Sequence, residues 1–359
     1  RGMGVPPMKH GQDARATPVG KGFCKTLYHD GTKNAKGQDT MKGIRLTWRR
    51  AITNTMGRID RLFTFGPGGR SGLPTGLNTL DKVLQGLRKG EMIVLAADPS
   101  MGKTALAMNI VECVALGKDI YGRPMQGDHD RPHGVGIFSL VTSTETLAMR
   151  MLCSLAGVSS FKVFNGYCSI KTMNQHLTRA ADELAQAPIY VDDSGGFDVM
   201  DLRLRARQMA RNYKVELIVI DHLQSCNGRK LATRNRPVAT SLVSKQIKVM
   251  AGELNLPVIV LIRLDHTTEP CGDNTDRPTL ADLYGSGTIA QDADVVLLLR
   301  RPCKISGDPE SDDMRLAIVD VAKHRNGPTG EVRLDFDKAI MRFGDRIVPD
   351  IDPIADLEL

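Results

Sequence analysis

A short segment that contains glycine, lysine and threonine stands between a strand-like run and a helical pattern, at residues 97–104 (ADPSMGKT). In this setting backbone N–H groups and the N-terminus of a helix can surround phosphate groups. Gly102 would let the backbone approach the phosphates, Lys103 would contact the terminal phosphates, and the Thr104 hydroxyl would ligate Mg²⁺. The general pattern has glycine where Ala97 stands, so the match is incomplete. We expect the nucleotide contacts to come from Pro99, Ser100, Met101, Gly102, Lys103, Thr104 and Ala105.

An acidic residue ends a second apolar run, at residues 217–224 (LIVIDHLQ). Four apolar residues deliver Asp221 to the end of a predicted strand, where its carboxylate can hold the water shell of Mg²⁺. An aspartate in this place is common in α/β proteins and indicates little alone. Together with Lys103 and Thr104 it predicts a site for Mg²⁺ and a nucleotide.

The elements that position these residues alternate between strand and helix patterns after residue 72. Near-continuous apolar strands joined by helices predict an α/β fold with a mostly parallel sheet covered on both faces. The last two strands lie close together and predict a hairpin added at one edge. The predicted strands are 91–96, 134–140, 188–192, 216–221, 257–262, 294–299, 314–322 and 331–336.

Composition sets broad limits on the class of protein. The 41% apolar and 25% charged residues are typical of a soluble globular protein. The longest apolar runs are too short to span a bilayer, and no apolar segment of a signal peptide is visible near residue 1. The seven cysteines are scattered and form no CxxC pair, which indicates reduced thiols and a cytoplasmic location.

Charge divides the chain. Residues 1–70 contain 14 Lys and Arg against 4 Asp, whereas the remainder contains 34 basic against 37 acidic residues. The net charge of residues 71–359 therefore gives no argument that this part of the chain binds nucleic acid. We expect a disordered basic head at 1–38, a helix and Gly-rich hinge at 39–71, an α/β domain at 72–346, and an acidic tail at 347–359.

Apolar residues recur at helical spacing in the segment before the hinge. One interpretation packs this helix on its own core, and the other docks it on a neighbouring subunit. The apolar positions are Met41, Ile44, Trp48, Ile52, Met56, Ile59 and Phe63.

Taken together, these segments resemble the DnaB family of hexameric replicative helicases, from about residue 40 to 345. The stretches GLPTGLNTLDKVLQGLRKGEMIVLAADPSMGKTALAMNI, IYVDDSGG, IDHLQ, SGTIAQDADVVLLL and KHRNGPTGEVRLDF follow one another in the family's order, with Ala97 included. The resemblance implies a RecA-like P-loop NTPase core that binds ATP and Mg²⁺ and assembles as a homo-hexamer around single-stranded DNA. It also implies a linker helix before the hinge and a primase or a helicase loader as partner. The family's N-terminal helical domain has no counterpart here, so we expect it to be missing from this chain.

Further site residues follow from the resemblance, position by position. Lys323 and Arg325 would reach the γ-phosphate bound by the neighbouring subunit. An alternative is that both residues alternate on one face of an edge strand and lie in water. The family's DNA-contacting loop corresponds to residues 282–291, where its Arg-Glu pair is Tyr284-Gly285 and where Gly287 follows.

Three departures from the family concern hydrolysis or its coupling to DNA, and one of them is the pair Tyr284-Gly285. The family's glutamate that polarises the attacking water is replaced by Val141, which can neither accept a proton nor orient water. Glu145 lies four residues further on and is the candidate to replace it. The family's sensing glutamine is Arg263, which could bind a γ-phosphate but could not report its loss in the same way. The residues that hold the nucleotide are unchanged.

Two functions therefore remain open. The first is an ATP-dependent DNA helicase of the DnaB type. The second is a ring-forming paralogue that binds ATP, hydrolyses it poorly and serves as a regulatory or structural subunit.

Overall fold

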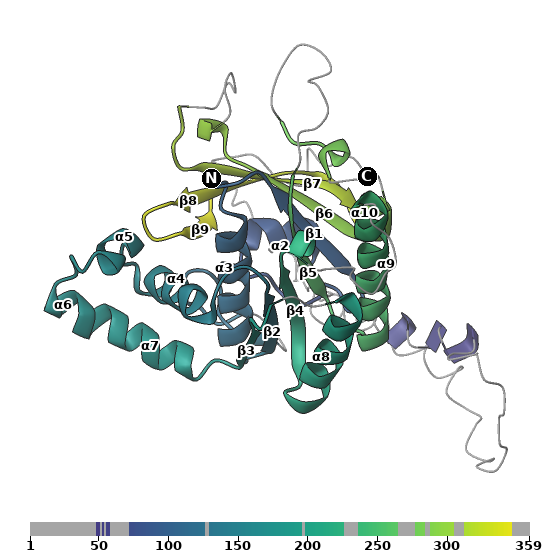
Figure 1. Cartoon of the computed structure of the whole chain (residues 1–359), viewed down its shortest axis with the longest axis horizontal. Helices are drawn as coiled ribbons and strands as arrows, with labels where there is room; N and C mark the ends of the chain where they lie inside the picture. The colour runs from purple at the N-terminus through teal and green to yellow at the C-terminus, as the bar shows by residue number, and fades with distance from the viewer. Residues whose placement is uncertain are drawn as a thin grey trace, which may run out of the picture. The chain divides into compact units, whose positions relative to one another are not determined.

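The computed structural model describes residues 48–50, 52–53, 55–57, 72–125, 129–195, 198–225, 236–264, 277–283, 288–304 and 312–346 (Figure 1). The chain divides into two units, residues 1–57 and residues 58–359. In the first unit, the described residues between 48 and 57 are helical. The predicted basic head and acidic tail lie outside the described residues, and the predicted domain boundaries remain predictions.

A nine-stranded sheet forms the centre of the second unit, in the order β3-β2-β4-β5-β1-β6-β7-β8-β9. The first six strands of this order pair in parallel and the last three pair antiparallel. The strands are β1 Met92–Ala97, β2 Gly134–Ser139, β3 Ile189–Asp192, β4 Val215–Asp221, β5 Val258–Arg263, β6 Val295–Arg300, β7 Leu316–His324, β8 Gly330–Asp337 and β9 Arg342–Asp345.

Helices cover both faces of this sheet, as the continuous apolar strands predict (Figure 1). On one face pack α2 (Asn78–Leu84), α3 (Lys103–Leu116) and α4 (Thr144–Ala156). On the other pack α8 (Val199–Asn212), α9 (Arg236–Leu254) and α10 (Thr288–Asp292). The alternation of strand side chains separates the two cores, since β1 sends Ile93, Leu95 and Ala97 to the first core and Met92, Val94 and Ala96 to the second.

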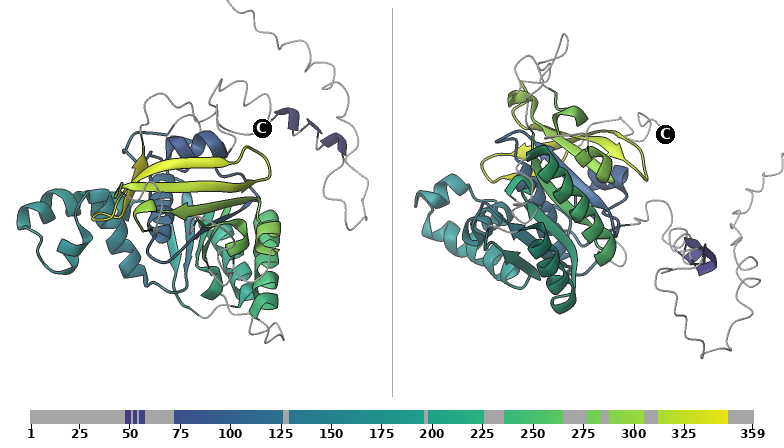
Figure 2. Two further views of the ribbon diagram at one scale, coloured as in Figure 1. Left: turned by 90° about the horizontal axis from the view of Figure 1, so that it is seen from above. Right: turned by 45° about the vertical axis from the view of Figure 1, so that its right-hand side comes forward.

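A group of short helices extends away from the sheet beyond α4 (Figures 1 and 2). It consists of α5 (Ser160–Phe164), α6 (Ile170–Thr172), a π-helical turn (Met173–Leu177) and α7 (Thr178–Ala185). Five large apolar side chains on it are exposed rather than packed: Phe161, Phe164, Tyr167, Ile170 and Met173. A cluster of this kind marks an interaction surface more often than an ordinary solvated face.

Each of the eight predicted strands is present, and the predicted α/β class is confirmed. The sequence did not predict β9, whose residues Arg-Phe-Gly-Asp carry no run of apolar or β-branched side chains. Because β9 pairs with β8, the expected hairpin is a three-stranded antiparallel extension. The alternative that placed Lys323 on an edge strand is wrong, because β7 pairs with β6 on one side and β8 on the other.

Candidate nucleotide site

The predicted phosphate loop leaves the sheet at the end of β1 and enters α3 at Lys103. Ser100 and Gly102 adopt left-handed conformations, with φ of 66° and 103°. A side chain at Gly102 would also meet the ring of Phe343, whose Cζ lies 3.1 Å from the position of an ideal Cβ. Backbone conformation and the packed ring therefore both require glycine here.

Side chains of strands β8 and β9 pack against the phosphate loop. The rings of Phe336 and Phe343 pack with their centroids 4.4 Å apart under Gly102. The backbone N–H of Phe343 donates to Oδ1 of Asn109 on α3, at 2.8 Å. Next to it, the guanidinium of Arg342 pairs with the buried carboxylate of Glu112 at 3.0 Å. Sequence reasoning missed these supporting residues, and a Phe two residues past a turn gives no signal that would have found them.

The structure brings together the residues predicted to hold Mg²⁺. The Thr104 hydroxyl donates to Oδ2 of Asp221 at 3.0 Å, and Asp221 is buried at the end of β4. A hydroxyl and a carboxylate oxygen are hard donors of the kind that Mg²⁺ prefers alongside its waters. Thr104 and Asp221 therefore fit the ion, which would supply charge neutralisation for the phosphates.

The ammonium of Lys103 lies in the same group. The pKa of Lys103 is lowered to about 8, first by burial and then by the positive charge of Arg263, while the carboxylates of Asp221 and Asp98 oppose the shift. An ammonium whose charge is disfavoured by burial gains from an anion placed beside it. Lys103 is thus ready to take up a phosphate.

Because the pKa of Lys103 is lowered to about 8, affinity for a nucleotide should fall as the pH rises through this value. Phosphate bound beside Lys103 raises its pKa, so binding takes up a proton wherever the free lysine is neutral. Affinity for ATP should be highest below about pH 8 and fall by roughly tenfold between pH 7.5 and 9.5. Calorimetry in two buffers of different ionisation enthalpy measures both the affinity and the proton uptake. A constant affinity with no proton uptake at pH 9.5 would contradict the assignment.

Val141, which stands in place of the family's glutamate, lies at the same end of the sheet as Asp221. Ser139, the last residue of β2, pairs with Asp221 in the parallel register, and Val141 follows two residues later. Val141 is 64% exposed. The exposed aliphatic side chain of Val141 therefore follows the strand end that pairs with Asp221, the acid predicted to hold Mg²⁺.

Glu145, the candidate to replace that acid, lies in the first turn of α4 after the N-cap Ser143. Its side chain is exposed. Among the described residues it makes no hydrogen bond or ion pair with Lys103, Thr104 or Asp221. Its catalytic role remains a prediction.

Lys323 and Arg325 lie at the end of the sheet opposite to the phosphate loop. The register pairs His324 with Val295, at the start of β6, whereas the phosphate loop follows the end of β1, which runs parallel to β6. A six-residue strand spans about 20 Å. Lys323 and Arg325 therefore lie far from the phosphate loop of the same chain.

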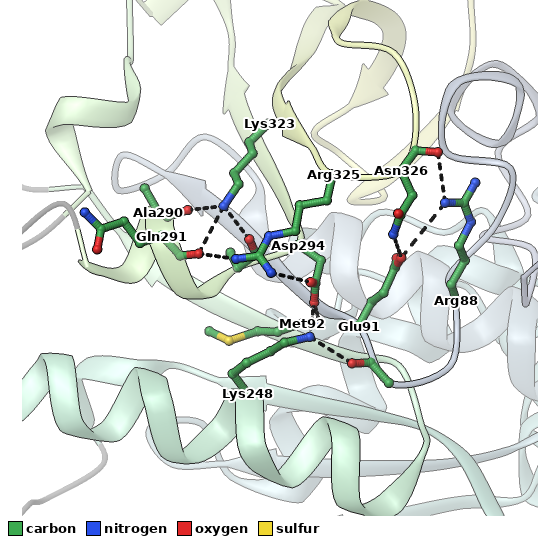
Figure 3. A network of polar contacts seen from close by, with 12 residues as sticks. Arg88, Glu91, Met92, Lys248, Ala290, Gln291, Asp294, Lys323, Arg325 and Asn326 are labelled. Carbon is green, nitrogen blue, oxygen red and sulfur yellow. Dashed lines mark hydrogen bonds and ion pairs between the residues drawn. The ribbon is translucent and has the colours of Figure 1, made fainter. Parts of the chain in front are cut away.

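Both cations are held by the end of α10 and by the residues after it (Figure 3). The Lys323 ammonium donates to the carbonyl oxygens of Gln291 at 3.2 Å and Ala293 at 2.7 Å. Arg325 donates to the Gln291 carbonyl and pairs with the buried carboxylate of Asp294 at 3.4 Å. Carbonyls at the C-terminus of a helix carry partial negative charge and attract cations. Lys323 and Arg325 are therefore positioned by the protein and do not lie free in water.

The remaining predicted residues, Tyr284, Gly285 and Gly287, lie outside the described residues, immediately before α10. Among the residues that the structure describes, no helix is long and apolar enough to cross a membrane.

Comparison with known proteins identifies the family of this chain. The family model of the DnaB-like helicase C terminal domain matches residues 72–345. The chain is 36% identical over 276 residues to the replicative DNA helicase DnaB of Geobacillus stearothermophilus, covering 77% of this chain and 57% of that protein. It is 35% identical over 292 residues to the replicative DNA helicase DnaC of Bacillus subtilis (strain 168), covering 81% of this chain and 60% of that protein. The chain thus spans less than two thirds of the length of these relatives.

Two solved structures resemble the fold. One is an isolated ATPase domain, which superposes with a TM-score of 0.72 at 28% identity and covers 82% of this chain and 99% of that domain. The other is a DnaB-like replicative helicase, solved in a study of its interactions with primase, with a TM-score of 0.72 at 28% identity, covering 84% of this chain and 69% of that one. Both likenesses agree with a RecA-like core. The chain belongs to the DnaB family of replicative helicases, of which it carries the C-terminal domain.

Proposed function

We propose that this chain is the motor domain of an ATP-dependent DNA helicase of the DnaB type. It forms a ring around single-stranded DNA and moves along that strand during replication. The observation that carries the proposal is the pairing of Thr104 with Asp221 beside Lys103, which supplies the groups that Mg²⁺-ATP requires. Kinship with replicative helicases supports DNA as the substrate.

Ring assembly is supported by the opposite positions of the nucleotide site and the two cations. Lys323 and Arg325 lie at the far edge of the sheet from Lys103, about a strand length away. In a ring, the far edge of one subunit can face the nucleotide of the next, so that these cations stabilise charge on its γ-phosphate. Hydrolysis would then be coupled to movement between subunits.

Two exposed apolar surfaces support contact between neighbouring subunits. Trp48, Ile52 and Met56 repeat every fourth residue along the first helical segment, and Trp48 is 80% exposed. The helices beyond α4 expose a second apolar set, which includes Tyr167 and Ile170. We propose that the helical segment of one subunit packs against these helices of its neighbour, which would bury both surfaces.

Removal of the first helical segment should therefore weaken the oligomer. Deleting residues 1–65 is expected to lower the mass measured by light scattering from that of the ring toward that of one chain. The point variant Ile52→Asp should act in the same direction, and Arg50→Asp, on another side of the helix, serves as its control. A truncated chain that keeps the full mass would show that the helix does not hold subunits together.

A second candidate function is favoured by one observation, the exposed Val141 at the place where the family has its catalytic glutamate. On this view the chain is a ring-forming subunit that binds ATP, hydrolyses it poorly and regulates or supports a replication assembly. Primase or a helicase loader would be its partner, as the resemblance implies.

Strand displacement separates the two functions. On a forked DNA duplex with Mg²⁺ and ATP, the helicase should release the displaced strand, at a slow rate set by turnover. The regulatory subunit should bind the single-stranded arm in the presence of ATP without releasing any strand. Duplex without a single-stranded arm is the control substrate.

A further inference from the structure

Asp294, between α10 and β6, is a buried aspartate that binds groups from three parts of the fold (Figure 3). Its Oδ2 accepts a hydrogen bond at 2.8 Å from the backbone N–H of Met92, at the start of β1, and another from the ammonium of Lys248 on α9. Its Oδ1 pairs with the guanidinium of Arg325 at 3.4 Å. The backbone N–H of Asp294 also donates to the carbonyl of Met92 at 3.0 Å. The position of this carboxylate is therefore set by the sheet and by α9, independently of Arg325.

The two cations at this end of the sheet differ in the donors that they have left. The ammonium of Lys323 has three N–H groups and donates to three carbonyl oxygens of residues 290–293, at and after the end of α10. The guanidinium of Arg325 has five N–H groups, of which its contacts with Asp294 and Gln291 engage two within the described part of the chain. The side chain of Arg325 is 45% exposed. Arg325 therefore keeps donors for a further anion, whereas Lys323 fastens the end of α10.

The charges of this group leave it positive. Two carboxylates, those of Asp292 and Asp294, act on the ammonium of Lys323 together with the cations Lys248 and Arg325. Three positive charges thus face two negative ones, and an anion that approaches the exposed guanidinium is attracted. A free arginine side chain samples many rotamers and loses this freedom when it binds a phosphate. The contact with Asp294 restricts Arg325 in advance and directs its remaining donors outward.

We infer that Asp294 is the positioning residue that orients Arg325 toward the nucleotide of the neighbouring subunit, and that Arg325 rather than Lys323 makes the contact with phosphate. The inference rests on the ring proposed above. Asp294 does not touch the nucleotide and acts only through the guanidinium that its Oδ1 holds. Without this carboxylate, Arg325 would keep a carbonyl contact but would face the repulsion of Lys323 and Lys248 without an opposing charge beside it.

The first test is the rate of ATP hydrolysis by the full, assembled chain with Mg²⁺ under single-turnover conditions, which resolve slow rates. Asp294→Asn is expected to slow hydrolysis by about ten- to a hundredfold, as a misplaced group does, and to change the affinity for ATP by less than about threefold. Asp294→Glu, which keeps the charge, should recover part of the rate. The matched control is Asp320→Asn on β7, which removes a half-buried carboxylate whose charged neighbours are Glu331 and Arg300, and it should leave the rate unchanged.

Mixed rings distinguish an effect on the neighbouring subunit from an effect within one subunit. Asp294→Asn and Lys103→Ala chains, co-expressed with different tags and purified over both, form rings that contain the two variants. Neither variant alone should hydrolyse ATP well, because one displaces Arg325 and the other removes the nucleotide site. In a mixed ring, a Lys103→Ala subunit presents its intact Arg325 to the intact site of an Asp294→Asn subunit. Random mixing produces this arrangement at about one interface in four, so the rate should return to roughly a quarter of the native rate.

Recovery in the mixed rings, with slow hydrolysis and unchanged ATP affinity in Asp294→Asn alone, supports the inference. Slow hydrolysis without recovery overturns it, because Asp294 then acts within its own subunit. An unchanged rate in Asp294→Asn also overturns it, and so does loss of oligomer mass in light scattering, since the carboxylate would then hold subunits together.

Arg325→Ala, measured in parallel, separates failure of the inference from failure of the proposed function. It should slow hydrolysis at least as much as Asp294→Asn does. If Arg325→Ala slows hydrolysis and Asp294→Asn does not, only the role of Asp294 is wrong. If Arg325→Ala has no effect, the proposed action of the cations on the neighbouring nucleotide is wrong as well.

Discussion

Replacing Lys103 with alanine should abolish binding of Mg²⁺-ATP at micromolar concentrations. Lys103 supplies a partly buried ammonium at the N-terminus of α3, and its removal leaves the phosphates without their nearest cation. Truncation of one partner in a buried charge pair costs about 2–5 kcal/mol. That cost corresponds to a loss of affinity of roughly 30- to 4,000-fold, which equilibrium binding of a fluorescent ATP analogue can measure.

The control for this variant is Lys82→Ala, which removes an exposed lysine from α2 on the surface of the same unit. Its affinity for ATP should equal that of the native chain. Thermal unfolding of both variants checks that the fold is kept. Unchanged affinity in Lys103→Ala would refute the phosphate-loop assignment and with it the proposed function.

Introducing an acid at position 141 should raise the rate of ATP hydrolysis. A carboxylate at this strand end orients and deprotonates the attacking water, an effect on the order of a hundred- to ten-thousand-fold. Val141 is exposed, so a glutamate there needs no buried space and has access to water. We expect Val141→Glu to raise kcat within this range at nearly constant ATP affinity, since Lys103, Thr104 and Mg²⁺ supply the binding contacts.

Val141→Gln is the matched control, because it has the size of glutamate without a basic carboxylate. It should leave kcat close to the native value. If the native chain already turns over fast and Val141→Glu adds nothing, another residue is the base. Glu145 is the first to replace in that case, by glutamine.

The sequence was sufficient to predict the α/β class, eight strands and the proximity of Thr104 to Asp221, because those features depend on local patterns. Apolar runs end at Ala97 and Asp221, and the parallel pairing of their strands brings both ends to one edge. The support of Gly102 by Phe343 depends instead on a contact between residues far apart in the chain. The same holds for Lys323, whose partners on α10 are brought to it by the pairing of β7 with β6.

Arg263 shows a different limit of prediction. Its residue type was visible as a departure from the family, but its relation to Lys103 was not. That relation follows from the order of the strands, which sets β5 between β4 and β1, and from the parity of side chains along β5. Neither order nor parity across strands can be obtained from spacing along one segment.

The most direct test of the account is the steady-state ATPase rate of the native chain, measured with and without single-stranded DNA at saturating Mg²⁺-ATP. Binding of ATP is confirmed in the same samples by calorimetry. We expect tight binding with slow turnover that single-stranded DNA stimulates little, because Val141 stands where the acid should be and Tyr284-Gly285 replaces the charged pair of the DNA-contacting loop. Fast turnover that rises strongly with single-stranded DNA would contradict the expected effect of Val141 and of Tyr284-Gly285 on hydrolysis, and would leave the helicase as the proposed function.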